Sequence, residues 1–211
     1  MKARPPLPTN TRKVNSMYCT ILPKSTSPLC RSISAFTRTL LDLNTKSSKV
    51  WILCPTPQDF QKGCSLPHSI LIHPISPIPT SASVIKNEKI PEAFRELYLQ
   101  DLGRAGFPGA TFSWQHPWDS SWNQSIAQFI LKHWRNANQS GVFQIFYIDP
   151  SEASNHELHL GILHRWFLGR AEGHRLGRFS NNRQNDKRYQ ESKCKWRSQV
   201  QLHCHVVPLL A

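Results

Sequence analysis

Residues 119–150 read DSSWNQSIAQFILKHWRNANQSGVFQIFYIDP, and this stretch decides the expected fold. Apolar side chains recur every three or four residues over 122–137, which is the pattern of a helix with one broad apolar face. The candidate caps of this helix are Asp119 or Ser120 at its start and Asn138 or Gly141 at its end.

The next seven residues, 142–148, are mostly β-branched or aromatic and almost continuously apolar. Such a run predicts a strand that is buried on both of its faces. A buried strand needs neighbours, and the candidates are residues 50–54, 70–75 and 111–114. Prolines crowd the first two of these runs, and they would confine both to the edges of a sheet because proline has no backbone N–H to donate.

Two further helices are expected at 91–102 and 151–168, with Ser151 as the cap of the second. The loop between the first helix and residue 119 is rich in aromatic side chains, which are expected to pack rather than to remain in water. The pattern therefore predicts a core of helix, loop, helix, strand and helix over about 86–168, in the α+β or α/β class. A unit of about 80 residues buries only about 60–65% of its unfolded surface, so a partner protein that completes the core is expected.

The net charge of +13 is concentrated on both sides of this core. Residues 1–85 hold ten Lys/Arg and two Asp/Glu, and residues 163–211 hold ten Lys/Arg and three Asp/Glu. Residues 86–162, in contrast, hold six Lys/Arg and eight Asp/Glu. Charge of this kind indicates partners rather than a fold, and the candidate partners are nucleic acid, anionic membranes and acidic proteins.

Three segments are therefore expected along the chain. Residues 1–85 form a basic, Pro/Ser-rich and mostly disordered segment, 86–168 form the folded core, and 169–211 form a basic disordered tail. Apolar residues at helical spacing between 33 and 43 also fit a short basic amphipathic helix, but a disordered tail is the preferred interpretation of that region.

The sequence also indicates a compartment. It contains no run of eighteen apolar residues, so no membrane span is expected, and the first residues lack the apolar stretch of a secretory signal. The six cysteines are irregularly spaced and are expected to be reduced in an intracellular protein. The basic composition favours the nucleus over the mitochondrion.

The stretch 165–197 combines basic and aromatic residues and carries the leading functional hypothesis. Arginine and lysine pair with phosphates, and aromatic rings stack on unpaired bases. The alternative is an ordinary solvated basic face with Trp166 and Phe167 in the core. The residues predicted to contact nucleic acid are Arg165, Trp166, Arg170, Arg175, Arg178, Arg183, Lys187 and Arg188.

Asp149 carries the competing hypothesis. It directly follows the expected strand and precedes a helix, and open α/β sheets bind ligands at the carboxyl ends of their strands. The chain would then be a fragment of a larger or mobile-element-derived protein, in which Asp149 belonged to a degenerate metal-dependent enzyme. Ordinary turn chemistry of Asp-Pro is the preferred explanation, and the chain is expected not to be an enzyme.

Histidine and cysteine side chains also raise the question of zinc. His156 and His159 are three residues apart, whereas the helical zinc protease motif needs four, and Cys194 has no second cysteine close by. The sequence therefore predicts no metal site and no cofactor.

Overall fold

The computed structural model describes residues 18, 20–43, 50–66, 75, 90–179, 191–193 and 196. Within these ranges every regular element is a helix and no strand occurs, so the expected α+β or α/β class is wrong. Contacts divide the chain into two units, Met1–Glu172 and Gly173–Ala211, and the packed core belongs to the first. The elements are α2 (Pro28–Leu40), η1 (Val50–Ile52), α3 (Pro57–Cys64), α4 (Ala93–Arg104), α5 (Ser121–Gln139), η3 (Gln144–Phe146), α6 (Pro150–Ser154) and α7 (His156–Arg175).

The helices expected at 91–102 and after Ser120 are confirmed as α4 and α5, which pack against each other. The Ser120 hydroxyl accepts the backbone N–H of Asn123 and so caps α5, as one of the two candidate caps predicts. Gly141 follows the other end of α5 with a φ of 80°, a conformation that glycine adopts without steric cost.

The helix expected over 151–168 is two helices, α6 and α7, and the first is capped by Asp149 instead of Ser151. The Asp149 carboxylate accepts the backbone N–H of Ser151 at 2.8 Å. Asn155 separates the two helices with an extended ψ of 96°, and its side chain accepts the N–H of Leu158 at 3.0 Å. Asn155 therefore ends one helix and caps the next.

The strand expected at 142–148 does not form. Val142 donates its N–H back to the carbonyl of Ala137 at 3.1 Å, and η3 follows in place of an extended chain. A strand also needs a hydrogen-bonding neighbour, but the run at 50–54 contains η1 and residues 111–114 are not extended strands. The remaining candidate, 70–75, lies outside the described residues except for Ile75.

Phe143 shows how the apolar residues of this run are buried without a sheet. Its ring stacks on Trp134 of α5 with centroids 5.7 Å apart, and it meets Phe36 of α2 edge-on at 5.7 Å. Helices thus supply the burial that the apolar run indicates, and this tertiary packing overrides the local preference for a strand.

Two helices of the core come from 1–85, which the sequence interpretation treated as mostly disordered. α2 begins at Pro28, and the Ser27 hydroxyl accepts the N–H of Cys30 at 3.3 Å to cap it. α2 then buries its apolar side against α4 and α5, while α3 packs against α5. The amphipathic helix that was the less favoured interpretation is therefore part of the fold.

The aromatic loop between α4 and α5 is packed, as its composition predicts. Asn123 of α5 is fully buried, and its amide accepts the N–H of Ser113 at 2.8 Å and donates to the carbonyl of Pro117 at 2.9 Å. The loop therefore forms a fixed surface on which Phe112 and Trp114 meet the rings of α7.

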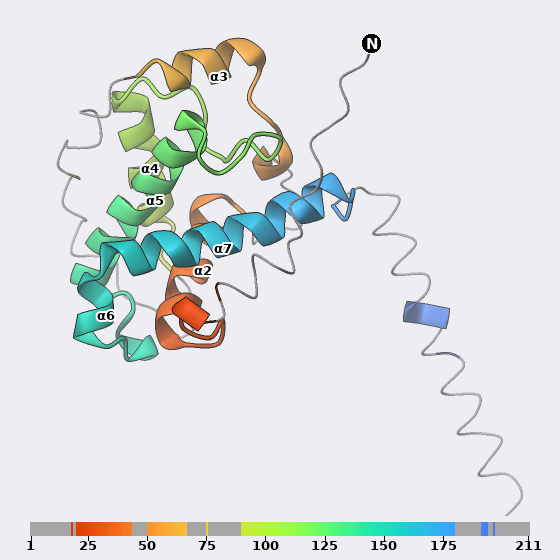
Figure 1. Cartoon of the computed structure of the whole chain (residues 1–211). Coiled ribbons are helices and arrows are strands. Elements are labelled where there is room, and N and C mark those ends of the chain that lie inside the picture. Colours follow the sequence, from red (N-terminus) through yellow and green to blue (C-terminus); the bar gives the residue numbers. More distant parts are fainter. Residues whose placement is uncertain are drawn as a thin grey trace, which may run out of the picture. The chain divides into compact units, whose positions relative to one another are not determined.

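α7 is long and crosses the molecule beside α2 (Figure 1), and Arg165 of α7 contacts Cys30 of α2. α3 lies at the other end of the bundle from α6. Among the described residues, no helix has both the length and the apolar character needed to cross a bilayer.

Candidate functional site

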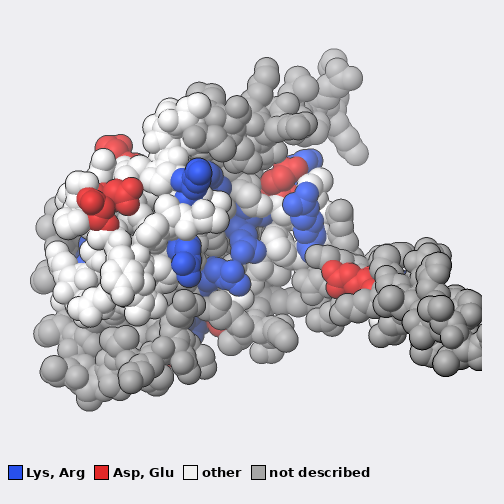
Figure 2. All heavy atoms as spheres, turned by 90° about the horizontal axis from the view of Figure 1, so that it is seen from below, with Lys and Arg blue, Asp and Glu red and all other residues white. Residues whose placement is uncertain are grey.

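Arginines gather where α2 and α7 lie together. Arg31 and Arg38 lie two turns apart on the same side of α2, both are exposed, and α2 contains no acidic residue. Arg165 and Arg170 come from α7. Figure 2, which views the molecule from the α2 side, shows Lys and Arg side chains gathered near the middle of that surface. We refer to Arg31, Arg38 and Arg170 as the arginine face.

Arg170 is held over two indole rings. Its guanidinium carbon lies 6.0 Å from the ring centroid of Trp51 and 5.5 Å from that of Trp166, so cation–π contacts fix its position. Burial, followed by repulsion from Arg38, lowers the pKa of Arg170 below its ordinary value. Arg38 and Arg170, which come from two different helices, therefore interact through their like charges.

The acidic residue that follows α2 does not neutralise Arg38. Asp42 faces Arg95 of α4, with 3.8 Å between the carboxylate and guanidinium atoms. No carboxylate in the described ranges forms an ion pair with Arg38. The Arg38 side chain is therefore available to an anionic ligand.

Arg165 is turned toward the chain that precedes α2. Its guanidinium donates to the carbonyl of Pro23 at 2.9 Å and to the sulfur of Cys30 at 3.0 Å. The structure thus separates two arginines that the sequence grouped together, because Arg170 reaches the arginine face and Arg165 is engaged internally.

The aromatic residues of α7 belong to the core rather than to an open stacking surface. Phe167 is 2% exposed and stacks on Trp114 with centroids 5.6 Å apart. Trp166 is half-buried, contacts Phe112 and Trp114, and has Arg170 over its ring. Neither ring offers a free face for a base in this structure.

The remaining predicted contacts belong to the second unit or lie outside the described residues. Arg175 is exposed at the end of α7 and Arg178 is exposed in the turn that follows, and both belong to the second unit. Arg183, Lys187 and Arg188 lie outside the described residues.

Asp149 does not follow a strand, as the enzyme hypothesis requires, because residues 142–148 form no strand. Its carboxylate is exposed and accepts hydrogen bonds from the backbone and hydroxyl of Ser151, which lower its pKa. This is the helix-capping role that Asp-Pro turn chemistry predicts.

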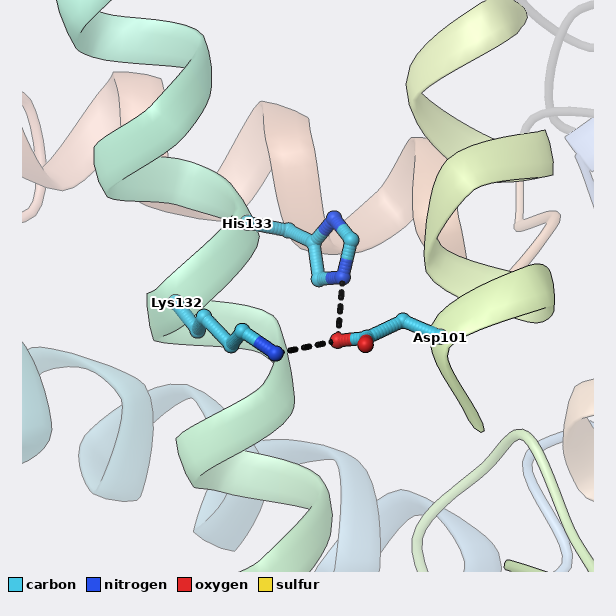
Figure 3. Close-up of polar contacts among 3 residues, drawn as sticks. All are labelled: Asp101, Lys132 and His133. Carbon is cyan, nitrogen blue, oxygen red and sulfur yellow. Dashed lines mark hydrogen bonds and ion pairs between the residues drawn. The ribbon is translucent and has the colours of Figure 1, made fainter. Parts of the chain in front are cut away.

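A second charged group, which the sequence analysis did not single out, lies between α4 and α5 (Figure 3). One carboxylate oxygen of Asp101 contacts the ammonium of Lys132 at 2.7 Å and Nε2 of His133 at 3.0 Å. The side chains of Asp101 and His133 are 5% and 0% exposed. Burial lowers the pKa of His133, so a neutral imidazole donates from Nε2 and leaves Nδ1 without a partner among the described residues.

This triad serves the packing of the fold. An Asp–His pair is a common general base, but a base must lie within hydrogen-bond reach of a substrate, and these two groups are enclosed between helices. The sequence contained a signal for it. Asp101 lies seven residues after Phe94, on the apolar face of α4, and His133 lies among the apolar positions of α5.

Within the described residues, no three His, Cys, Asp or Glu side chains are grouped so that they could hold a metal ion. Cys30, Cys54 and Cys64 carry free thiols. No protein family, no curated protein and no solved structure matches this chain.

Proposed function

We propose that the protein binds nucleic acid by contacting phosphates with its arginine face. The proposal is supported chiefly by the exposed Arg31 and Arg38 on one side of α2, a helix that contains no acidic residue. A phosphate on this side of α2 would accept charge-assisted hydrogen bonds from exposed guanidinium groups. The net charge of +13 adds a long-range attraction for a polyanion.

The arrangement favours recognition of the backbone over recognition of bases. Trp51 and Phe167 are buried, and Trp166 is covered by Arg170, so base stacking has no free ring here. Phosphate contacts carry no sequence information, and binding is therefore expected to be independent of sequence and strongly dependent on salt. A nuclear location remains part of this proposal.

The test is fluorescence anisotropy with a short labelled DNA duplex at about 0.1 M salt. Arg38→Ala should weaken binding about five- to tenfold, because one charge-assisted phosphate contact is lost. The matched control is Lys62→Ala, which removes one exposed positive charge from α3, away from α2. Equal losses of affinity in both variants would mean that only the net charge of the protein matters. An unchanged affinity in Arg38→Ala would refute the site.

A further inference from the structure

The chain before α2 lies along α7 and contacts three of its residues. We call residues 18 and 20–23 the strap. The hydroxyl of Tyr18 hydrogen-bonds Nδ1 of His164, and the carbonyl of Pro23 accepts from Arg165 at 2.9 Å. Between these polar contacts, Leu22 is buried at Gly161.

The strap packs against α7 at Gly161. A Cβ atom placed there would lie 2.9 Å from a methyl carbon of Leu22, which is closer than real side-chain carbons approach. The methyl group of Leu22 therefore occupies space that a side chain at position 161 would need. A larger side chain at this position would displace the strap and would leave the helix intact, since most residues have a higher helix propensity than glycine.

The described residues of the strap bury little apolar surface. Leu22 is its one buried apolar side chain among the described strap residues, whereas Ile21 is 72% exposed. Segments with few buried contacts open at a small fraction of the global unfolding free energy. A turn joins the strap to α2, with the N–H of Ser27 donating to the carbonyl of Lys24 at 2.8 Å, so the strap can swing without unwinding the helix.

Two functional groups are occupied by the closed strap. The thiol of Cys30 is 1% exposed and lies 3.7 Å from the Pro23 carbonyl and 3.0 Å from the Arg165 guanidinium. On α7, Arg165 precedes Arg170 by five residues. Arg165 contacts Cys30 in the first turn of α2, whereas Arg170 interacts with Arg38 in the last turn of α2. Opening the strap would remove the Pro23 carbonyl from the Arg165 guanidinium and leave Cys30 of α2 as its other contact.

We propose that the strap is an autoinhibitory element that withholds Arg165 from nucleic acid and that its opening adds a fourth arginine to the arginine face. This inference rests on the proposed function of that face. It predicts that the open form binds a duplex more tightly, with the gain depending on Arg165. One additional phosphate contact corresponds to a gain of about three- to tenfold and a steeper salt dependence.

The first measurement follows strap opening without any ligand. Gly161→Met should displace Leu22, and the rate of Cys30 alkylation, mapped by peptide mass spectrometry, should rise at least about tenfold. Gly169→Met is the matched control, because Gly169 lies on the same helix with nothing within 4 Å of its Cβ position. Leu22→Ser opens the strap from the other side and leaves α7 unchanged.

The second measurement compares duplex affinity in the same variants. Gly161→Met and Leu22→Ser should both bind more tightly than the wild type, and adding Arg165→Ala to either should abolish the gain. Faster alkylation without a gain in affinity would overturn the proposal, as would unchanged alkylation in both opening variants. If the wild type binds and Arg38→Ala weakens it while the strap variants do nothing, only this inference fails. If the wild type does not bind duplex, the proposed function itself fails.

Discussion

The buried triad between α4 and α5 brings opposite charges together, whereas the arginine face on α2 and α7 brings like charges together. In the triad, one carboxylate of Asp101 meets Lys132 at 2.7 Å and His133 at 3.0 Å, and all three groups are largely withdrawn from water. On the face, Arg38 and Arg170 carry the same charge and repel each other. A buried charge that loses its partner is costly to the fold, whereas like charges on a surface oppose the compact state only weakly and attract anions.

The largest expected effect is on the triad. Asp101→Asn removes the counter-charge of Lys132 in a buried setting and should lower the free energy of unfolding by about 3 kcal/mol in urea denaturation. Asp149→Asn is the control, because Asp149 is an exposed cap and asparagine caps a helix as well as aspartate does. A loss below about 1 kcal/mol for Asp101→Asn would show that the triad is not a stabilising contact.

Acid should weaken the fold through three histidines. Burial lowers the pKa of His133 and His159, and it lowers that of His164 to about 4. The unfolded chain therefore binds more protons than the folded one between pH 6.5 and 4, and stability falls as the pH falls through that window.

We expect a loss of about 1–2 kcal/mol across this range after solvent screening of the half-buried His164. Urea midpoints measured at steps across the window test this expectation. His164→Gln should flatten the acid end of the profile, and a flat wild-type profile would contradict the burial of these imidazoles in their neutral form.

The cap of α6 should have a smaller effect. Asp149→Ala removes the acceptor for the Ser151 N–H and should cost about 1 kcal/mol, as typical caps do. Enzymatic importance of Asp149 would instead appear as a change in activity without a change in stability, which this structure gives no reason to expect.

The smallest effect should fall on the arginine face. Arg38→Ala should change the unfolding free energy by less than about 0.5 kcal/mol, and any change should be stabilising because a like charge next to Arg170 is removed. Thermal melts at low and high salt would test this. A destabilisation above about 1 kcal/mol would mean that Arg38 contributes to the stability of the fold.

The sequence revealed those parts of the structure that local patterns determine. The periodicity over 122–137 and the cap Ser120 located α5. The aromatic content of the loop between α4 and α5 predicted that this loop is buried. Gly141, one of the two residues predicted to end α5, follows the helix with a positive φ. These features depend on residues within one or two turns of each other.

The parts that the sequence missed depend on long-range contacts. Residues 142–148 have strand composition, but Phe143 packs on Trp134 and Phe36, and no described strand is present to pair with them. The electrostatic interaction between Arg38 and Arg170 involves positions far apart in the chain, so no spacing rule could have found it. Arg170 was predicted and Arg38 was not, for this reason.

The salt dependence of duplex binding shows whether Arg38 contacts a phosphate. The slope of log affinity against log salt should be less steep by about 0.9 in Arg38→Ala than in the wild type, which corresponds to one lost phosphate contact, and unchanged in Lys62→Ala. Identical slopes in all three proteins would contradict the account, because the arginine face would then contribute no more than any other positive charge on the surface.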